Sequence, residues 1–279
     1  MRNLALILIT FTLILTACQN SDKKCCDTDS ANSMAALASD KSFKDAHEAP
    51  LPLEINGKGK MISFPSPDGK NGTAYFISSS NKTNNYLFVF HEWWGLNDYI
   101  KQTADSYSDS LGVNVIAIDL YDGKVATNSS EAGTLVQSNV TARSQAIIKG
   151  GLNYAGKDAK VATLGWCFGG GWSMQGALLA GRNETGCVMY YGMPETDVTK
   201  LKSLNSNVLF IWANKDQWIN ADVKNSFVSN MKTAGKELTV KEYSADHAFA
   251  NPSNPHYEKD VTADAQKITI DYLRKSFSR

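Results

Sequence analysis

The sequence predicts an α/β protein in which a mostly parallel central sheet carries helices on both faces. From residue 51 onward, short apolar runs alternate with segments of helical periodicity. The runs over residues 86–90 and 208–213 are almost entirely apolar, which is typical of strands buried on both faces of a parallel sheet. In such sheets the functional residues lie at the carboxyl ends of the strands.

Eight short runs of β-branched, aromatic and aliphatic residues predict the strands. They cover residues 61–64, 73–78, 86–90, 113–118, 161–164, 187–191, 208–213 and 238–243. Apolar residues three or four positions apart predict helices over residues 98–111, 131–154, 221–233 and 261–277. We expect the second of these helices to break near Gly150 and Gly151.

Composition bounds the class of protein. The chain has 279 residues, of which 43% are hydrophobic and 20% charged, as in a globular protein with a sizeable core. Positive and negative residues both number 28, so no basic field indicates a nucleic acid partner. Residues 51–279 are enough for one α/β domain, which we expect to be monomeric.

The first 18 residues resemble a bacterial lipoprotein signal peptide. Arg2 precedes an apolar stretch over residues 4–15 that is too short to span a bilayer. Leu15-Thr16-Ala17-Cys18 then resembles the lipoprotein cleavage box, after which Cys18 would carry the lipid. The alternative is an ordinary signal peptide with a coincidental cysteine. We expect an exported protein that Cys18 anchors to the bacterial cell envelope, at the outer membrane or on the periplasmic face.

Residues 19–50 predict a flexible tether. They are rich in Ser, Asp, Lys and Ala and contain almost no aromatic residue. Cys25 and Cys26 lie in this tether as an adjacent pair, which rarely bridges without strain. His47 lies there too, so we do not expect it in a functional site. No tetrahedral metal spacing exists among the five cysteines.

The strand over residues 161–164 leads into the most informative motif, Gly165-Trp166-Cys167-Phe168-Gly169-Gly170-Gly171. Apolar residues then recur at helical spacing, so Cys167 should lie on a tight turn between a strand and a helix. This is the arrangement of the G-x-S-x-G nucleophile elbow, with cysteine in place of serine. The start of a helix beside the sulfur should lower the thiol pKa. The alternative is a buried cysteine with glycines for close packing.

An acid and a histidine follow Cys167 in the order that this elbow requires. Asp216 comes just after the strand over residues 208–213, and His247 just after the strand over residues 238–243. It is less probable that three residues of the required types follow three strand ends by chance than that one does. We therefore predict a catalytic triad in which Cys167 attacks an acyl carbon, His247 pairs with the thiolate and later activates water, and Asp216 orients the imidazole.

Two backbone N–H groups should bind the oxyanion that forms during such an attack. We predict that of Phe168, which follows the nucleophile, and that of Trp93, in the loop after an early strand. Trp93 or Trp94, together with Trp218, are expected to line an apolar cleft over Cys167. Trp172 and Trp212 are expected in the core.

Metal and nucleotide chemistry are poorly supported. His91-Glu92 begins like H-E-x-x-H, but the residue four positions after His91 is Gly95. The glycines over residues 165–171 match neither G-x-G-x-x-G nor a P-loop. We expect no metal and no cofactor.

Together these motifs resemble the dienelactone hydrolase family of the α/β-hydrolases, over residues 51–279. The resemblance rests on the Cys167 motif and on four further ones, His91-Glu92-Trp93-Trp94-Gly95-Leu96-Asn97, Asp119-Leu120-Tyr121, Tyr190-Tyr191-Gly192 and His247-Ala248-Phe249. It implies hydrolysis of a small ester or lactone through a thiol ester. It also implies that Glu92 pairs with the Cys167 thiol and helps to activate it, and that Tyr121 contacts the substrate.

The sequence departs from well-known family members at two positions. Their arginines that grip the substrate carboxylate are replaced here by Gly123 and Asn251. Lys124 lies next to the first position and is our candidate for a substrate contact, although it lacks the bidentate fork of arginine. Dienelactone itself is therefore not the expected substrate. Two alternatives stay open, a thioesterase or small-acyl esterase with the same machinery, and an anchored binding protein without turnover.

Overall fold

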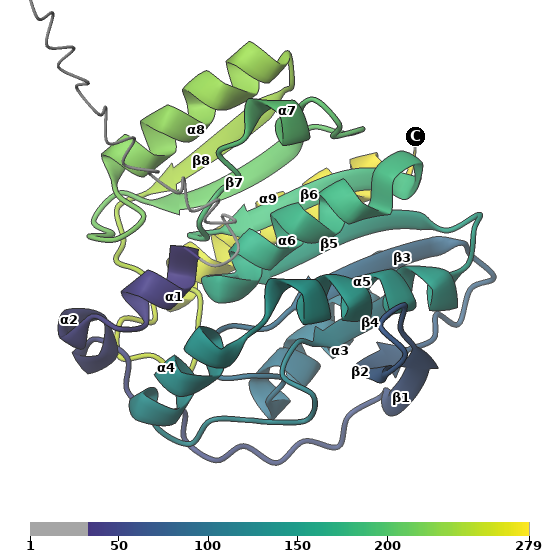
Figure 1. Cartoon of the computed structure of the whole chain (residues 1–279), viewed down its shortest axis with the longest axis horizontal. Helices are drawn as coiled ribbons and strands as arrows, with labels where there is room; N and C mark the ends of the chain where they lie inside the picture. The colour runs from purple at the N-terminus through teal and green to yellow at the C-terminus, as the bar shows by residue number, and fades with distance from the viewer. Residues whose placement is uncertain (1–32, 279) are drawn as a thin grey trace, which may run out of the picture.

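An eight-stranded sheet forms the centre of the protein (Figure 1). This computed structural model describes residues 33–278. The strands are β1 (Lys60–Pro65), β2 (Asn71–Ile77), β3 (Asn85–Phe90), β4 (Asn114–Asp119), β5 (Lys160–Trp166), β6 (Glu184–Tyr190), β7 (Val208–Ala213) and β8 (Leu238–Tyr243). All eight predicted strands are confirmed.

The strand order is β1-β2-β4-β3-β5-β6-β7-β8. β2 pairs antiparallel with both β1 and β4, and every other neighbouring pair is parallel. The six parallel strands therefore end at the same edge of the sheet. β4 and β7 are buried along their whole length, as their apolar sequences predict.

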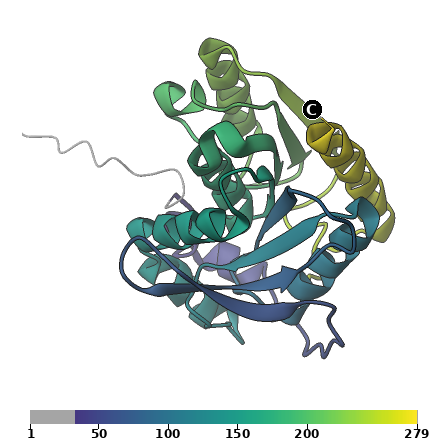
Figure 2. The same ribbon diagram turned by 90° about the vertical axis from the view of Figure 1, so that its right-hand side faces the viewer.

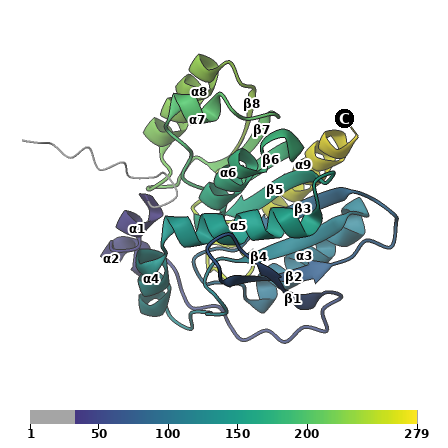
Figure 3. The same cartoon turned by 45° about the vertical axis from the view of Figure 1, so that its right-hand side comes forward.

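Helices cover both faces of the sheet (Figures 2 and 3). α5 and α6 lie on one face, and α3 and α9 pack against each other on the opposite face. The helices of residues 51–278 are α3 (Asp98–Leu111), α4 (Ser129–Ser138), α5 (Thr141–Ala155), α6 (Phe168–Ala180), α7 (Val198–Leu201), α8 (Ala221–Ala234) and α9 (Lys259–Phe277). The predicted fold class is confirmed.

The helical segment predicted over residues 131–154 does break, but the predicted position of the break, near Gly150 and Gly151, is wrong. The segment forms two helices, α4 and α5, which are separated at Asn139 and Val140. Gly150 and Gly151 lie inside α5, where each is buried against the sheet. A Cβ on Gly150 would lie 2.7 Å from the carbonyl oxygen of Pro65, so close packing of α5 on β1 explains this glycine.

The predicted flexible tether does not extend to residue 50. Two short helices, α1 (Ser33–Leu37) and α2 (Lys41–Asp45), lie next to α4 at one end of the sheet (Figures 1 and 3). Met34, Ala38, Phe43 and His47 are buried, because this stretch carries one apolar or aromatic side chain per helical turn. We call residues 33–47 the N-terminal segment.

The predicted signal peptide, the lipidation site Cys18 and the Cys25-Cys26 pair lie outside the described residues. No helix among residues 33–278 is both long enough and apolar enough to cross a membrane.

Candidate active site

Cys167 occupies the turn between β5 and α6. Its backbone has φ 54° and ψ −120°, a conformation that non-glycine residues rarely adopt. The neighbouring glycines are required by close backbone approaches. A Cβ on Gly165 would lie 2.0 Å from the Gly169 carbonyl oxygen, and one on Gly169 would lie 2.3 Å from that of Phe90. The elbow geometry that the motif predicts is therefore present.

Three side chains meet at the carboxyl edge of the sheet. The Nε2 atom of His247 lies 3.2 Å from the Cys167 Sγ atom, and the Nδ1 atom lies 2.6 Å from Asp216 Oδ2. The exposed fractions of Cys167, His247 and Asp216 are only 1%, 4% and 4%. The sequence predicts this convergence, and the three residues form a continuous hydrogen-bonded chain from sulfur to carboxylate.

The two loops that carry His247 and Asp216 fix both side chains. Asp216 Oδ1 accepts the backbone N–H groups of Trp218 and Ile219 at 2.8 and 2.9 Å, which leaves Oδ2 for the imidazole. Ala248 next to His247 has φ 62°, so the loop after β8 turns sharply at the histidine.

His247 and Asp216 stabilise each other's charged forms. Burial opposes the imidazolium, but the Asp216 carboxylate and the Cys167 sulfur outweigh it and raise the pKa of His247 well above its ordinary value. Burial also opposes the Asp216 carboxylate, yet His247 and the two backbone N–H groups lower the pKa of Asp216. The Asp216 carboxylate therefore favours proton uptake by His247.

The pKa of Cys167 is raised in this structure, whereas the sequence predicts a lowered one. Burial penalises the thiolate and raises the pKa of Cys167, and the nearby Glu92 carboxylate acts in the same direction. His247 and the backbone N–H of Phe168 lower the pKa, as predicted, but they do not outweigh burial. The backbone N–H of Phe168 interacts with the sulfur. A donor to the oxyanion must lie beside the nucleophile in the same way.

Glu92 lies in the loop after β3 and is 7% exposed. Its Oε2 atom accepts a hydrogen bond from Asn251 Nδ2, while Oε1 has no hydrogen-bond partner among the described residues. Burial raises the pKa of Glu92 to about 7, partly offset by the charge on His247. Asn251, at the position of a family arginine, thus gives Glu92 a neutral partner rather than a cation.

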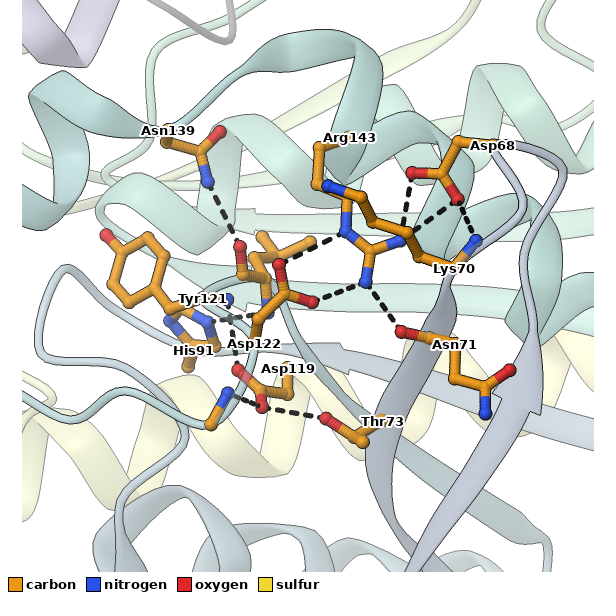
Figure 4. Close-up of polar contacts among 12 residues, drawn as sticks. Asp68, Lys70, Asn71, Thr73, His91, Asp119, Tyr121, Asp122, Asn139 and Arg143 are labelled. Carbon is orange, nitrogen blue, oxygen red and sulfur yellow. Dashed lines mark hydrogen bonds and ion pairs between the residues drawn. The ribbon is translucent and has the colours of Figure 1, made fainter.

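His91 connects the loop after β3 to the loop after β4 by hydrogen bonds. Its Nδ1–H donates to the Glu92 carbonyl oxygen at 2.6 Å, and its Nε2 accepts the Leu120 N–H at 3.1 Å. Figure 4 shows His91 beside Tyr121 in the loop over residues 119–123. The Asp119 carboxylate accepts the N–H groups of Tyr121 and Gly123 within this loop and the hydroxyl of Thr73, which ties the loop to β2.

The predicted substrate contacts Tyr121 and Lys124 lie in this second loop. Burial raises the pKa of Tyr121 well above its ordinary value, with a further contribution from Cys167. The Tyr121 hydroxyl has no partner among residues 33–278. Lys124 is exposed at the rim of a cavity of about 360 Å³. Arg143 lines the same cavity and pairs with Asp68 and Asp122 (Figure 4).

Of the three tryptophans predicted to line the cleft, Trp218 is the one whose ring contacts that of His247 among the described residues. The ring of Trp218 lies 5.6 Å from that of His247, nearly perpendicular to it. Trp93 contacts Trp94 at 4.9 Å. Trp94 lines a cavity of about 320 Å³ next to Glu92 and Asn251. Trp172 and Trp212 are in the core, as expected.

Sequence reasoning missed two residues of the N-terminal segment that lie at the site. Phe43 contacts the rings of Trp93, Trp218 and His247 at 5.1, 4.9 and 5.8 Å. His47 lies 5.4 Å from His247, and its Nδ1–H donates to the Phe43 carbonyl oxygen at 2.6 Å. The signal was an aromatic residue and a histidine four positions apart, in a stretch otherwise free of aromatic residues.

The described part of the chain offers no cluster suited to a metal ion. Within residues 33–278, no group of three or more His, Cys, Asp or Glu side chains has an arrangement that could hold one.

Comparisons with known proteins identify relatives over most of the chain. Residues 73–277 match the model of the dienelactone hydrolase family. The protein usf of Aquifex pyrophilus is 28% identical over 232 residues, which cover 78% of this chain and 98% of that protein. A putative carboxymethylenebutenolidase of Aquifex aeolicus is 26% identical over 231 residues, which cover 77% of this chain and 98% of the relative.

Solved structures share the fold. A dienelactone hydrolase-like promiscuous phosphotriesterase from metagenomic libraries superposes with a TM-score of 0.68 at 20% identity, over 79% of this chain and all of that chain. A putative dienelactone hydrolase from Klebsiella pneumoniae gives 0.66 at 22% identity, over 77% of this chain and 98% of the other. The chain belongs to the dienelactone hydrolase family and is a carboxylic ester hydrolase with the α/β-hydrolase fold.

Proposed function

We propose that this hydrolase cleaves carboxylic esters or lactones through a covalent thiol ester on Cys167. The observation that carries the proposal is the continuous chain from Cys167 Sγ to His247 at 3.2 Å and on to Asp216 at 2.6 Å. Each of the three residues follows a different strand, and the nucleophile lies on a strained turn at the start of α6. A merely structural cysteine needs neither a histidine partner nor such a turn.

The first half of the reaction forms the thiol ester. The Cys167 sulfur forms a bond to the acyl carbon while its proton passes to His247 Nε2, and the carbonyl electrons move onto oxygen. The N–H groups of Phe168 and Trp93 donate to this oxyanion. When the carbonyl re-forms, the C–O bond breaks and the leaving alkoxide takes the proton from His247.

The second half releases the acid. His247 removes a proton from a water molecule as the water attacks the thiol ester carbon, and the C–S bond breaks when the intermediate collapses. The proton returns from His247 to the sulfur. Asp216 holds the imidazole in one tautomer throughout, since its Oδ2 accepts the Nδ1–H.

Glu92 takes part in activation of the thiol under this proposal. Its unpartnered Oε1 and its electrostatic effect on Cys167 place a carboxyl group with a pKa of about 7 next to the reacting sulfur. An ionised Glu92 can accept the thiol proton when substrate binding separates the sulfur from His247.

A panel of esters, lactones and acyl thioesters tests the proposal by both turnover and mass spectrometry. An ester should leave only its acyl part on Cys167, whereas a lactone should add its whole mass because its alcohol stays attached. The Cys167→Ala variant should carry no adduct, and Cys187→Ala is the matched control that should keep it. An adduct on another residue, or turnover that survives in Cys167→Ala, would contradict the mechanism. Preference for acyl thioesters would favour the thioesterase alternative.

We also propose that Cys18 anchors the enzyme to the cell envelope. The support is the Leu15-Thr16-Ala17-Cys18 box after a short apolar stretch. Metabolic labelling with a fatty acid should mark the wild type in the membrane fraction, and Cys18→Ser should lose the label. Unlabelled wild-type protein in the soluble fraction would contradict this proposal.

A further inference from the structure

The N-terminal segment packs against the catalytic histidine, and we call this packing the cover. Cys167 is 1% exposed and His247 is 4% exposed, so an ester carbonyl cannot approach the sulfur in this conformation. Attack requires the carbonyl carbon to come within about 3.5 Å of the nucleophile along an open direction. The segment contributes Phe43 and His47, whose rings lie 5.8 and 5.4 Å from that of His247.

The Phe43 ring lies among three aromatic side chains, as the ring of a bound ligand could. Trp93 and Trp218 present their rings to it at interplanar angles of 82° and 79°, and His247 lies on a third side. Edge-to-face contact of this kind is favourable for any flat ring and does not depend on the chain that carries it. The three side chains that receive Phe43 belong to the loops predicted to form the substrate cleft.

Several buried polar atoms around the site are unsatisfied while the segment is docked. His47 Nε2, Trp93 Nε1, Glu92 Oε1 and the Tyr121 hydroxyl are all buried and have no hydrogen-bond partner among the described residues. A buried polar group without a partner is destabilising, so the docked state is weaker than its aromatic contacts suggest. Oxygen atoms beside a substrate ring could accept hydrogen bonds from the Trp93 N–H and the Tyr121 hydroxyl, which the segment leaves without partners.

The segment itself is attached by few elements. α1 and α2 have five residues each and pack on α4, where the Gln137 side chain donates to the Ser39 hydroxyl at 2.9 Å. Short helices of this length depend on their tertiary contacts for stability. Local opening of the segment can therefore occur without unfolding the sheet.

We propose that residues 33–47 are a displaceable occupant of the substrate cleft, and that Phe43 marks a subsite for a flat apolar ring flanked by hydrogen-bonding oxygens. The enzyme then acts on esters or lactones that carry such a ring, and these compete with its own N-terminal segment. The assignment of a substrate class rests on the proposed function, whereas the cover itself does not.

The rate at which iodoacetamide alkylates Cys167 tests the cover without any need for turnover. Phe43→Ala removes the ring from the cleft. Gly133→Leu displaces the segment from the α4 side, because a Cβ at Gly133 would already lie 3.0 Å from the Ala38 carbonyl oxygen. Lys41→Ala is the control within α2, since the Lys41 side chain is 87% exposed and contacts Asp45.

We expect alkylation of Cys167, followed by mass spectrometry of its peptide, to be about ten-fold faster in Phe43→Ala and in Gly133→Leu, as the open population grows. Lys41→Ala should react like the wild type, and circular dichroism should show all four proteins folded. Equal rates in the four proteins would overturn the cover. Faster alkylation in both displaced variants, with no ester hydrolysis by any protein, would leave the cover intact and contradict the proposed function.

The ring subsite has its own test. In Phe43→Ala the neutral probe p-cresol, a flat ring with one oxygen, should fill the vacated position and slow alkylation of Cys167. The wild type should gain little protection, because Phe43 already occupies the subsite. Failure of p-cresol to protect Phe43→Ala at millimolar concentration would overturn the subsite.

Discussion

Cys167 follows β5 and Cys187 lies within the neighbouring strand β6; both are almost fully buried, yet their surroundings differ. The Cys187 sulfur lies 3.7 Å from the Ser173 hydroxyl oxygen. Burial raises the pKa of Cys187 to about 12. Cys167 lies past the end of β5, on a turn that faces an imidazole.

The comparison teaches that burial alone makes a thiol inert, and that a reactive thiol needs a proton acceptor as well. Burial raises the pKa of both cysteines. Only Cys167 has His247 within reach, and His247 in turn has Asp216. The difference lies in the position on the strand, since only a residue past the strand end can meet side chains from other loops.

The largest effect should be the difference in activity between a variant without the Cys167 thiol and a variant without the Cys187 thiol. Cys167→Ala should lower kcat on an ester substrate by on the order of 10⁴-fold, because the covalent step is lost. Cys187→Ala should leave kcat within about two-fold, since its sulfur contacts only core residues. Steady-state kinetics of the two variants provide the measurement. A comparable loss in both would mean that position on the strand does not separate them.

The second effect concerns His247, the proton acceptor that Cys187 lacks, and the carboxylate of Asp216 that holds it. Asp216→Asn should lower kcat by roughly 10³-fold or more, because the neutral side chain no longer fixes the His247 tautomer. Asp246→Asn is the matched control, one residue before the histidine, where the half-exposed carboxylate contacts His256. Full activity in Asp216→Asn would show that the imidazole works without its carboxylate.

A third effect compares two buried carboxyls near these cysteines. Burial raises the pKa of both, to about 7 for Glu92. Glu184 accepts hydrogen bonds from Ser206 and Asn205, whereas Glu92 Oε1 has no partner among the described residues. Because the folded protein binds the Glu92 proton more tightly than the unfolded chain, this contribution to stability is present below about pH 4.5 and is lost as pH rises through 7.

Urea unfolding at several pH values measures that contribution. Glu92→Gln should be more stable than the wild type at pH 8 by about 2 to 3 kcal/mol, and the advantage should disappear toward pH 4.5. Glu184→Gln should show no such gain, since it disrupts existing hydrogen bonds. An advantage of Glu92→Gln that does not change with pH would contradict the assigned titration.

The smallest effect should be on packing around Cys187. Cys187→Ala leaves a small cavity between β6 and α6 and should lower the free energy of unfolding by about 1 kcal/mol. Cys187→Ser should cost more, because a buried hydroxyl that does not gain a good hydrogen bond is destabilising. Thermal unfolding of both variants measures the difference. Greater stability of the serine variant would mean that its hydroxyl finds a partner in Ser173 or Thr163.

Strands, their order along the chain and the residues past their ends were predictable from sequence. Apolar runs such as residues 208–213 are unambiguous, and in parallel sheets the residues that follow them share one edge. This is why Cys167, Asp216 and His247 could be expected together, although they are far apart in the chain. The Gly150-Gly151 pair misled, because glycine in a helix can also serve close packing on a sheet.

The N-terminal segment and the net pKa of Cys167 were beyond sequence reasoning for a physical reason. Composition assigns residues 19–50 to a tether on average, but four buried side chains, with Phe43 among aromatic rings, dock residues 33–47. The thiol pKa is a balance between a favourable imidazole and an unfavourable environment. The sign of the net shift depends on how deeply the sulfur is buried, which the motif alone does not reveal.

Near-complete burial of Cys167 has a consequence for the oxidation of its sulfur. Sulfur at 1% exposure is sheltered from peroxide and from disulfide exchange, which both need direct contact with the thiolate. The resting enzyme therefore keeps its nucleophile in the reduced form, and oxidative damage should accumulate during turnover rather than storage.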